Sequence, residues 1–369
     1  YRKKMMLIAS FIGAITILRS IDAFQPPRLH TSSGWGKTST KASIGMRRST
    51  SVGAALEGDV VTVDYSLTLP KSTDENEDAV PDVFDRGEVS FVVGMGNYLP
   101  ALHETVVSMS PGESITGAKA EAGFGPRDEE NLVIKIPPEN LPEEMKDVKV
   151  GSKLFLQGGA QCTVVEFSDD GGFIIDANHP LAGKHYNLDV SLREVTKPNP
   201  SLSGSSYSDR HQMATFGLGC FWGGELAFMR KQGVVGTKVG YSQGQKENPT
   251  YEETCSGTTG HTEAVRVIFD PAVITYEELC RRAVAKLGSS VYLLNQVGAD
   301  QGTQYRSGFY YHDDSQREVA AAVLAELGPD CKVELEPAAD TFWDAESYHQ
   351  QYLFRGGQSA KKDAEEVIR

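Results

Sequence analysis

The feature that most restricts the fold of this chain is a break at residues 196–206, which read Thr-Lys-Pro-Asn-Pro-Ser-Leu-Ser-Gly-Ser-Ser. Proline, serine and glycine dominate this stretch and leave little to bury, which is typical of a linker. The 369 residues are enough for two ordinary domains and a leader. We therefore predict one domain at residues 57–195 and a second at residues 213–369, joined by a linker at residues 196–212.

The first 56 residues differ in composition from the rest of the chain. Basic residues at Arg2–Lys4 and an apolar run over Met5–Leu18 are typical of a signal peptide, which we predict at residues 1–23. Residues 24–56 contain no Asp or Glu and many Ser and Thr, as transit peptides do. A signal peptide followed by a transit peptide, with Phe24 at the junction, resembles the bipartite presequence of algae with secondary plastids. It implies delivery to the plastid stroma, and the alternative is the secretory pathway.

The charge of the chain restricts its partners. The formal net charge is -14, and because the basic leader holds nine Lys or Arg and one acid, the remainder carries -22. Nucleic acid is excluded as a partner, since phosphate contacts need clustered Lys and Arg. We expect no stable membrane association after the leader is removed. The five cysteines include no Cys-x-x-Cys pair, which predicts reactive thiols in a reducing compartment and no metal site.

Residues 57–195 predict a small β-rich α+β domain. Apolar and polar side chains alternate over residues 60–69, which indicates a half-buried strand. Cys162 alternates with Val164 and is expected in the core. One helix is predicted from Leu99 to Met109. Further strands are predicted at residues 87–93, 134–136, 153–155, 162–167 and 187–192.

Short motifs in this domain, among them Gly94-Met95-Gly96 and Asn178-His179-Pro180, resemble those of the FKBP-type prolyl isomerases of the SlyD-like branch. The resemblance implies an inserted chaperone flap, placed between about Arg127 and Gly159, and an apolar basin that twists X–Pro bonds. Peptide binding without isomerisation, or a purely structural domain, remain alternatives. The residues that would line the basin are Tyr65, Asp85, Phe91, Leu99, Leu102, Phe124 and Leu188.

In the second domain a short apolar strand, Met213–Leu218, runs into Gly219-Cys220-Phe221-Trp222-Gly223. Apolar residues then recur at helical spacing, which places Cys220 at the first turn of a helix. Free amides and the positive end of the helix dipole favour a thiolate there, and the thiolate is the nucleophilic form. We therefore predict that Cys220 is a nucleophile.

A buried acid is predicted downstream of Cys220. Residues 261–269 alternate, and Glu263 shares a face with Val265 and Val267. Burial disfavours the carboxylate, so Glu263 could donate a proton; the alternative is a strand-end Glu that leans into water. Asn248 is expected to cap a helix that carries Tyr251 in its first turn.

Five motifs in order resemble the A-type methionine sulfoxide reductases, MsrA, over residues 213–354. They are Gly-Cys-Phe-Trp-Gly, Asn-Pro-Thr-Tyr, Cys-Ser-Gly-x-Thr-Gly-His-x-Glu-Ala-Val-x-Val, Gly-Thr-Gln-Tyr-Arg-Ser and Glu-x-Tyr-His-Gln-Gln-Tyr-Leu. The resemblance implies an α/β sandwich with a ferredoxin-like core, and therefore a two-domain α+β chain. It also implies a peptide-methionine (S)-S-oxide reductase that needs no metal or bound cofactor.

The resemblance further assigns roles. Cys220 would attack the sulfoxide and become a sulfenic acid. Glu263 would protonate the sulfoxide oxygen, helped by Tyr251 and Tyr305, with Asp300 nearby. Phe221 and Trp222 would form the apolar wall that holds the S-methyl group. Substrates would be oxidised or unfolded proteins, and thioredoxin or another thiol would supply the reducing equivalents.

The sequence leaves open which thiol resolves, that is reduces, the sulfenic acid on Cys220. Cys280 and Cys331 are expected in the core, on a helix and a strand respectively. Cys255 follows Tyr251 by one helical turn and could resolve the sulfenic acid. Plant-type members end in Ile-Arg-Cys-Tyr-Gly, so we expect that residues beyond Arg369 are missing. A second departure lies at residues 287–293, where the family has Asn-His-Asp-Pro, and it is expected to alter one rim of the pocket.

Two further functional classes compete with the reductase. One is a plastid chaperone or prolyl isomerase whose second domain has lost its activity. The other is a protein in which oxidation of Cys220 switches binding to a partner. The intact set of Cys220, Glu263, Tyr251 and Tyr305 favours the reductase.

Overall fold

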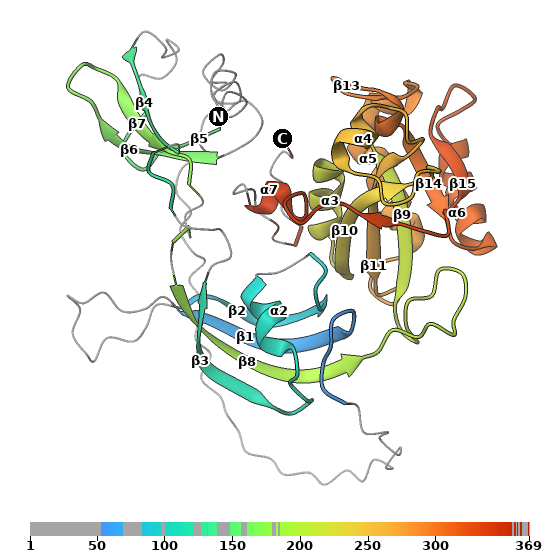
Figure 1. Cartoon of the computed structure of the whole chain (residues 1–369), viewed down its shortest axis with the longest axis horizontal. Helices are drawn as coiled ribbons and strands as arrows, with labels where there is room; N and C mark the ends of the chain where they lie inside the picture. Colours follow the sequence, from blue (N-terminus) through green and yellow to red (C-terminus); the bar gives the residue numbers. More distant parts are fainter. Residues whose placement is uncertain are drawn as a thin grey trace.

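The computed structural model describes residues 53–68, 83–96, 100–121, 127–130, 132–138, 148–155, 161–178, 182–183, 185–355, 358, 360, 362–363 and 368. The predicted leader, residues 1–56, therefore lies outside the described residues apart from its last four. Two α+β domains follow each other along the chain, as predicted (Figure 1). In the described part of the chain no helix is both long and apolar enough to cross a membrane.

The first domain is built on an antiparallel sheet of order β2-β1-β8-β3, with helix α2 packed against it (Figure 1). Its elements are β1 Val60–Thr68, β2 Val83–Val92, α2 Pro100–Val106, β3 Ser114–Glu121 and β8 His185–Thr196. Alternate residues of β8 are buried, Leu188 and Val190 among them, because one face of the strand meets the core. The predicted strands at 60–69, 87–93 and 187–192 are confirmed, and β3 is an addition.

A second, smaller sheet of order β4-β7-β6-β5 projects from this domain. Its strands are β4 Val133–Ile136, β5 Lys153–Phe155, β6 Gln161–Phe167 and β7 Phe173–Asp176. It has its own core, in which Cys162 is 1% exposed, as expected. The prediction that the flap ends at Gly159 is wrong, because β6 and β7 pair with each other and complete this sheet.

The second domain has a mixed sheet of order β15-β14-β9-β11-β10-β16. Its strands are β9 Gln212–Leu218, β10 Val234–Ser242, β11 Thr262–Phe269, β14 Ser307–Tyr311, β15 Glu334–Pro337 and β16 Trp343–Asp344. Its helices are α3 Phe221–Met229, α4 Tyr251–Cys255, α5 Tyr276–Leu287, α6 Asp314–Ala325 and α7 Tyr352–Arg355. Between α5 and β14 lie η3 Gly288–Tyr292, β12 Gln296–Val297, β13 Asp300–Gln301 and η4 Thr303–Tyr305.

The succession β9-α3-β10-β11-α5-β14 with the strand order β14-β9-β11-β10 is the ferredoxin-like arrangement, so that prediction is confirmed. Phe216 of β9 lies at the centre of this core. Its ring stacks on Phe228 of α3 at 5.0 Å and on Tyr276 of α5 at 6.0 Å. Both helices are therefore fixed on the strand that leads to Cys220.

Residues 200–204 of the predicted linker are exposed, as their composition predicts, but residues 205–208 and 211 are packed. The Tyr207 hydroxyl donates to the Gly58 carbonyl at 2.6 Å, and Ser208 hydrogen-bonds the buried ring of His211 at 2.9 Å. Tyr207 also packs against the apolar cluster of Val92, Met95, Val235 and Ile268. The prediction of little to bury therefore holds for residues 200–204 and fails for residues 205–208 and 211.

The two domains touch through the edge of β10. The Thr237 amide donates to the Gly96 carbonyl at 3.0 Å. Next to this bond, Val92 and Met95 of the first domain pack with Val235 and Ile268 of the second. Beside this contact a cavity of about 300 Å³ lies between the domains.

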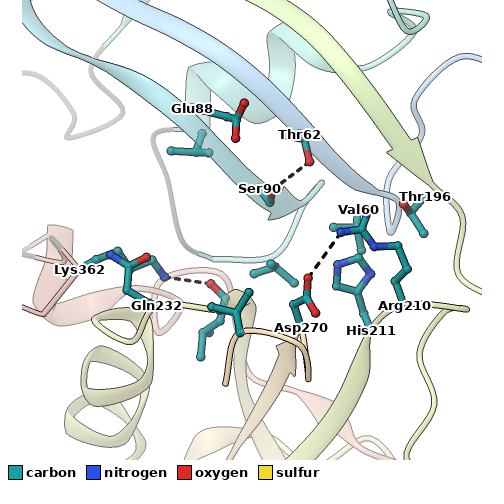
Figure 2. A pocket seen from close by; sticks show the side chains of 15 residues that line it. Val60, Thr62, Glu88, Ser90, Thr196, Arg210, His211, Gln232, Asp270 and Lys362 are labelled. Carbon is teal, nitrogen blue, oxygen red and sulfur yellow. Dashed lines mark hydrogen bonds and ion pairs between the residues drawn. The ribbon is translucent and has the colours of Figure 1, made fainter. Parts of the chain in front are cut away.

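Figure 2 shows the cavity lined from both domains, with Arg210 directed at Asp270. Arg210 forms an ion pair with Asp270 at 3.6 Å and another with Glu194 at 3.0 Å. Lys362 donates to the carbonyls of three residues at 2.9 Å, which are Met229, Lys231 and Val234. The cations of the cavity are therefore already paired within the protein.

Candidate active site

Cys220 lies where β9 ends and α3 begins, as predicted. It is the N-cap residue of α3 and is partly exposed. The preceding Gly219 has φ +72, and a Cβ there would stand 2.5 Å from Cβ of Val297. Glycine is therefore required at this turn, both for the left-handed backbone and for the close approach of the β12 strand.

Glu263 is the buried acid of the site. It lies on β11, is 1% exposed, and its Oε2 accepts a hydrogen bond from the Phe221 amide at 3.0 Å. Burial, together with the negative charge of Asp300, raises the pKa of Glu263 to about 8, although the Phe221 amide opposes the shift. At neutral pH this carboxyl group holds its proton, and it is bound to the amide of the residue that follows Cys220.

The prediction of a lowered pKa for Cys220 is wrong for the resting protein. Burial is the main cause that raises the pKa of the Cys220 thiol to about 12, and the negative charges of Glu263, once it has lost its proton, and of Asp300 act in the same direction. A hydrogen bond from the Trp222 amide and the charge of Lys286 act in the opposite direction. The first turn of α3 therefore supports a thiolate, but desolvation outweighs it.

Two tyrosines lie near Glu263. Burial raises the pKa of Tyr251 and of Tyr305, and each phenol feels the charge of Glu263. The Tyr251 hydroxyl hydrogen-bonds the thiol of Cys255. Tyr251 stands at the first position of α4, as expected, but Thr250 is the N-cap.

The expected cap at Asn248 is wrong because Thr250 and Glu253 form a reciprocal capping box. The Thr250 hydroxyl accepts from the Glu253 amide at 3.3 Å, and the Glu253 carboxylate accepts from the Thr250 amide at 3.0 Å. Asn248 instead adopts φ +47, a left-handed conformation that asparagine tolerates.

Phe221 and Trp222, the predicted apolar wall, differ in exposure. Phe221 is fully buried, whereas Trp222 is partly exposed. The Trp222 indole N–H donates to Nδ1 of His349 at 3.2 Å, and its ring stacks on Tyr352 at 3.9 Å. Trp222 is thus the member of the pair that presents a surface toward solvent. The structure keeps both beside Cys220.

His349 joins the site although no role was predicted for it. Its ring is 2% exposed and lies 4.4 Å from the Tyr251 ring and 5.2 Å from the Phe221 ring. Burial lowers the pKa of His349, so the ring is neutral at pH 7 and accepts from Trp222. The Glu-x-Tyr-His-Gln-Gln-Tyr-Leu motif was the signal that could have identified it.

The remaining cysteines fall into two groups. Cys280 is fully buried in α5, which begins with the predicted capping box of Thr275 and Glu278. Cys331 packs against the core, but it precedes β15, so the prediction that it lies within a strand is wrong. Cys255 is partly exposed at the end of α4. It is therefore the cysteine next to the tyrosine pair.

The departure at residues 287–293 forms η3 and the start of the loop to β12. Ser290 is buried and its hydroxyl accepts from the Gly298 amide at 3.1 Å, which ties η3 to the hairpin of β12 and β13. Asp300 of β13 is exposed. Its charge reaches both Cys220 and Glu263. This hairpin is therefore one rim of the site.

Of the predicted isomerase basin, only part lies within the described residues. Phe91, Leu102 and Leu188 are fully buried in the core of the first domain, and Tyr65 is partly exposed against it. Leu99, Phe124 and the side chain of Asp85 lie outside the described residues. The basin therefore stays a prediction.

Over the described residues no cluster of His, Cys, Asp and Glu is arranged to hold a metal ion. The functional groups that do meet are a cysteine at a helix N-terminus and a carboxyl group that keeps its proton. Such a pairing is able to supply a nucleophile and a proton donor within one site.

Comparisons with known proteins identify the family. The family model described as peptide methionine sulfoxide reductase matches residues 212–366. The rice peptide methionine sulfoxide reductase A2-1 (Oryza sativa subsp. japonica) is 44% identical over 178 residues, which are 46% of this chain and 94% of the rice protein. The chain therefore belongs to the peptide methionine sulfoxide reductase family. The family model described as FKBP-type peptidyl-prolyl cis-trans isomerase matches residues 53–153, so the chain is a fusion of the two.

Two further similarities concern the reductase part. Peptide methionine sulfoxide reductase A4, chloroplastic, of Arabidopsis thaliana is 45% identical over 171 residues, covering 44% of this chain and 65% of that protein. Among solved structures, methionine sulfoxide reductase A of Corynebacterium diphtheriae is 35% identical, covers 40% of this chain and 76% of its own, and has a TM-score of 0.36.

Proposed function

We propose that this chain reduces methionine-S-sulfoxide in peptides and proteins, with Cys220 as the nucleophile and Glu263 as the proton donor. The observation that carries the proposal is the buried, protonated Glu263 bound to the amide next to Cys220 at 3.0 Å. A sulfoxide oxygen needs a proton before its sulfur accepts a thiol, and a carboxyl group with a pKa of about 8 supplies one at neutral pH.

The proposed step balances within the site. The Cys220 sulfur attacks the sulfur of the protonated sulfoxide and forms an S–S bond. That bond and the sulfoxide S–O bond then break as the oxygen passes to the Cys220 sulfur, so methionine is reduced and Cys220 becomes a sulfenic acid. The Glu263 proton goes to the oxygen, and the thiol proton of Cys220 restores the carboxyl group. Tyr251 and Tyr305 would donate hydrogen bonds to the oxygen, and Trp222 would contact the methyl group. Asp300 helps to keep Glu263 protonated through its negative charge.

Reduction of the sulfenic acid requires a thiol and no bound cofactor. We assign Cys255 as the first resolving thiol, because it is partly exposed and next to Tyr251. Thioredoxin is the proposed final reductant. The proposed compartment is the plastid stroma, supported by the composition of residues 1–56 and by the chloroplastic relative.

The reductase is tested with the full chain, dithiothreitol and separate S and R epimers of a methionine sulfoxide peptide. We expect turnover of the S epimer alone, its loss in Cys220→Ser and its retention in Cys331→Ser, a matched change at a cysteine outside the site. Turnover of the S epimer by Cys220→Ser would contradict the assignment, and so would turnover of neither epimer by the native chain.

The first domain is proposed to bind unfolded or Pro-containing substrate for the reductase, with prolyl isomerisation as a second activity. Its match to the FKBP family favours this role, and tethering raises the concentration of bound peptide near Cys220. Separated domains at equal concentration should repair an oxidised unfolded protein more slowly than the intact chain. Equal rates would overturn the coupling.

A further inference from the structure

One cation beside Cys220 has no part in the mechanism above. Lys286 lies in the last turn of α5, and its side chain crosses the first turn of α3. A Cβ on Gly223 would stand 2.9 Å from Cε and 3.2 Å from Nζ of Lys286. Gly223 is three residues after the N-cap Cys220, and positions separated by three residues are neighbours on a helix surface. The ammonium group therefore lies against the turn that carries the reactive sulfur.

Of the charged groups around Lys286, Cys220 attracts its ammonium group most strongly. Neither a hydrogen bond nor an ion pair joins its ammonium group to another residue in the described part of the chain. Burial lowers the pKa of Lys286, and the charge of Cys220 opposes this more strongly than that of Asp300. Arg282, one turn earlier on α5, lowers it further.

Over the described residues, the charged and titratable groups that act on the Cys220 sulfur come from four elements. Glu263 on β11, once it has lost its proton, and Asp300 on β13 disfavour a Cys220 thiolate through their negative charge. Tyr305 of η4 also feels the Cys220 charge. In the described part of the chain Lys286, on α5, is the cation that acts on the sulfur, and it lowers the pKa of Cys220. It is therefore the group that offsets the two acids.

We propose that Lys286 is a positioning residue of the reductase, whose ammonium group lies over the first turn of α3 and stabilises the negative charge on Cys220. The inference rests on the proposed nucleophilic role of Cys220. Glycine at position 223 is part of the same arrangement, because a side chain there would displace Lys286. An ordinary role for Lys286, favourable contact with the C-terminal dipole of α5, predicts an effect on stability alone.

The test measures the rate of Cys220 alkylation by iodoacetamide against pH in the full chain, with Cys220→Ser to define the background. Lys286→Met should shift the profile to higher pH and slow alkylation at pH 8 about tenfold, since tenfold in thiolate corresponds to one unit of pKa. Lys286→Arg should restore most of the rate. Gly223→Ala, which keeps the lysine but displaces it, should shift the profile in the same direction as Lys286→Met.

Arg281→Met is the matched control, because it removes one positive charge from the exposed face of α5, where Arg281 pairs with Glu277 and Glu326. It should leave the alkylation profile unchanged. A Lys286→Met profile equal to the native one would overturn the proposal, even with a lowered melting temperature. Alkylation needs no sulfoxide, so failure of the reductase assay and failure of this proposal are separate results.

Discussion

Glu263 shows at the scale of one residue how burial produces a catalytic acid. Its carboxyl group is 1% exposed and accepts a hydrogen bond from a backbone amide, yet its pKa is raised to about 8 because desolvation outweighs that bond. A group with a raised pKa keeps its proton until the pH passes the raised value. The acid form is therefore present through neutral pH and is lost above about pH 8.

The pH dependence of the reductase follows from this residue. We expect kcat/KM for the S epimer to fall about tenfold for each pH unit above 8, because the required proton is lost. Glu263→Gln should lower kcat by about 10² to 10³ and remove this alkaline limb. Glu225→Gln, another buried carboxyl of the domain, should keep the limb. A limb that persists unchanged in Glu263→Gln would contradict the role of Glu263.

Cys255 carries the second prediction at this scale. Its thiol is hydrogen-bonded by the Tyr251 hydroxyl, which lowers the pKa of the thiol against the effect of burial. Cys255→Ser should keep turnover with dithiothreitol, which is small enough to reach Cys220. It should lose at least about tenfold in turnover with thioredoxin. Equal thioredoxin-supported rates in both proteins would mean that an external thiol or another cysteine resolves Cys220.

At the scale of elements, the chemistry depends on how α3 is held. Glu225, inside α3 and 1% exposed, accepts from the Gln351 amide at 2.7 Å and from the Thr237 hydroxyl at 3.3 Å. One carboxyl group thus joins the helix to β10 and to the segment that carries Tyr352. Burial raises the pKa of Glu225 to about 7.

The raised pKa of Glu225 predicts a pH-dependent stability. The folded protein binds this proton more tightly than the unfolded chain. The stability that Glu225 contributes is therefore fully present below about pH 4.5 and is lost as the pH rises toward 7. Glu225→Gln, which mimics the protonated form, should reduce the loss of unfolding free energy between pH 5 and pH 8 by up to about 3 kcal/mol. Urea unfolding at both pH values measures this, and an unchanged difference would contradict it.

Elements with strong local patterns could be predicted from the sequence, and those held by hydrogen bonds or by exposed polar residues could not. Residues 261–269 alternate in polarity, and they form β11 with Glu263 on the core face. In contrast, β3 is mostly exposed and carries little apolar signal. The capping box at Thr250 competes with Asn248 within three residues, and spacing alone does not decide between them.

The same distinction applies to the site. Cys220 and Glu263 stand in recognisable local patterns. Lys286 becomes part of the site only through the packing of α5 on α3, and α5 begins 56 residues after Cys220. The raised pKa of Cys220 likewise follows from burial by distant segments. Such effects are tertiary and are not encoded in any short stretch.

At the scale of the whole molecule, the two domains are joined by more than the chain. Two contacts cross the boundary between the domains: the hydrogen bond between Thr237 and Gly96, and the apolar packing of Val92 with Val235. In addition, Arg210 of the connecting segment forms ion pairs with Glu194 and Asp270. The cavity in Figure 2 lies beside these contacts. We therefore expect the domains to keep a fixed orientation in solution.

A bulky side chain placed at the contact between the domains tests this orientation. A Cβ on Gly236 of β10 would stand 2.8 Å from Val92 and 3.5 Å from Met95, and the three nearest atoms belong to the first domain. Gly236→Leu should separate the domains and raise the radius of gyration in small-angle X-ray scattering, with reduction of a small sulfoxide peptide retained. Gly53→Leu, where a Cβ meets nothing within 4 Å, is the matched control. An unchanged radius in Gly236→Leu would contradict the docked arrangement.

The most direct test of the account is to find where the sulfoxide oxygen goes. Cys255→Ser protein would receive one equivalent of an S-epimer sulfoxide peptide without thiol, in the presence of dimedone, which traps sulfenic acids. Mass spectrometry would then locate the adduct while the methionine peptide is quantified. The account predicts about one equivalent of methionine and an adduct on Cys220. Methionine formed with the adduct on another cysteine, or no methionine at all, would contradict it.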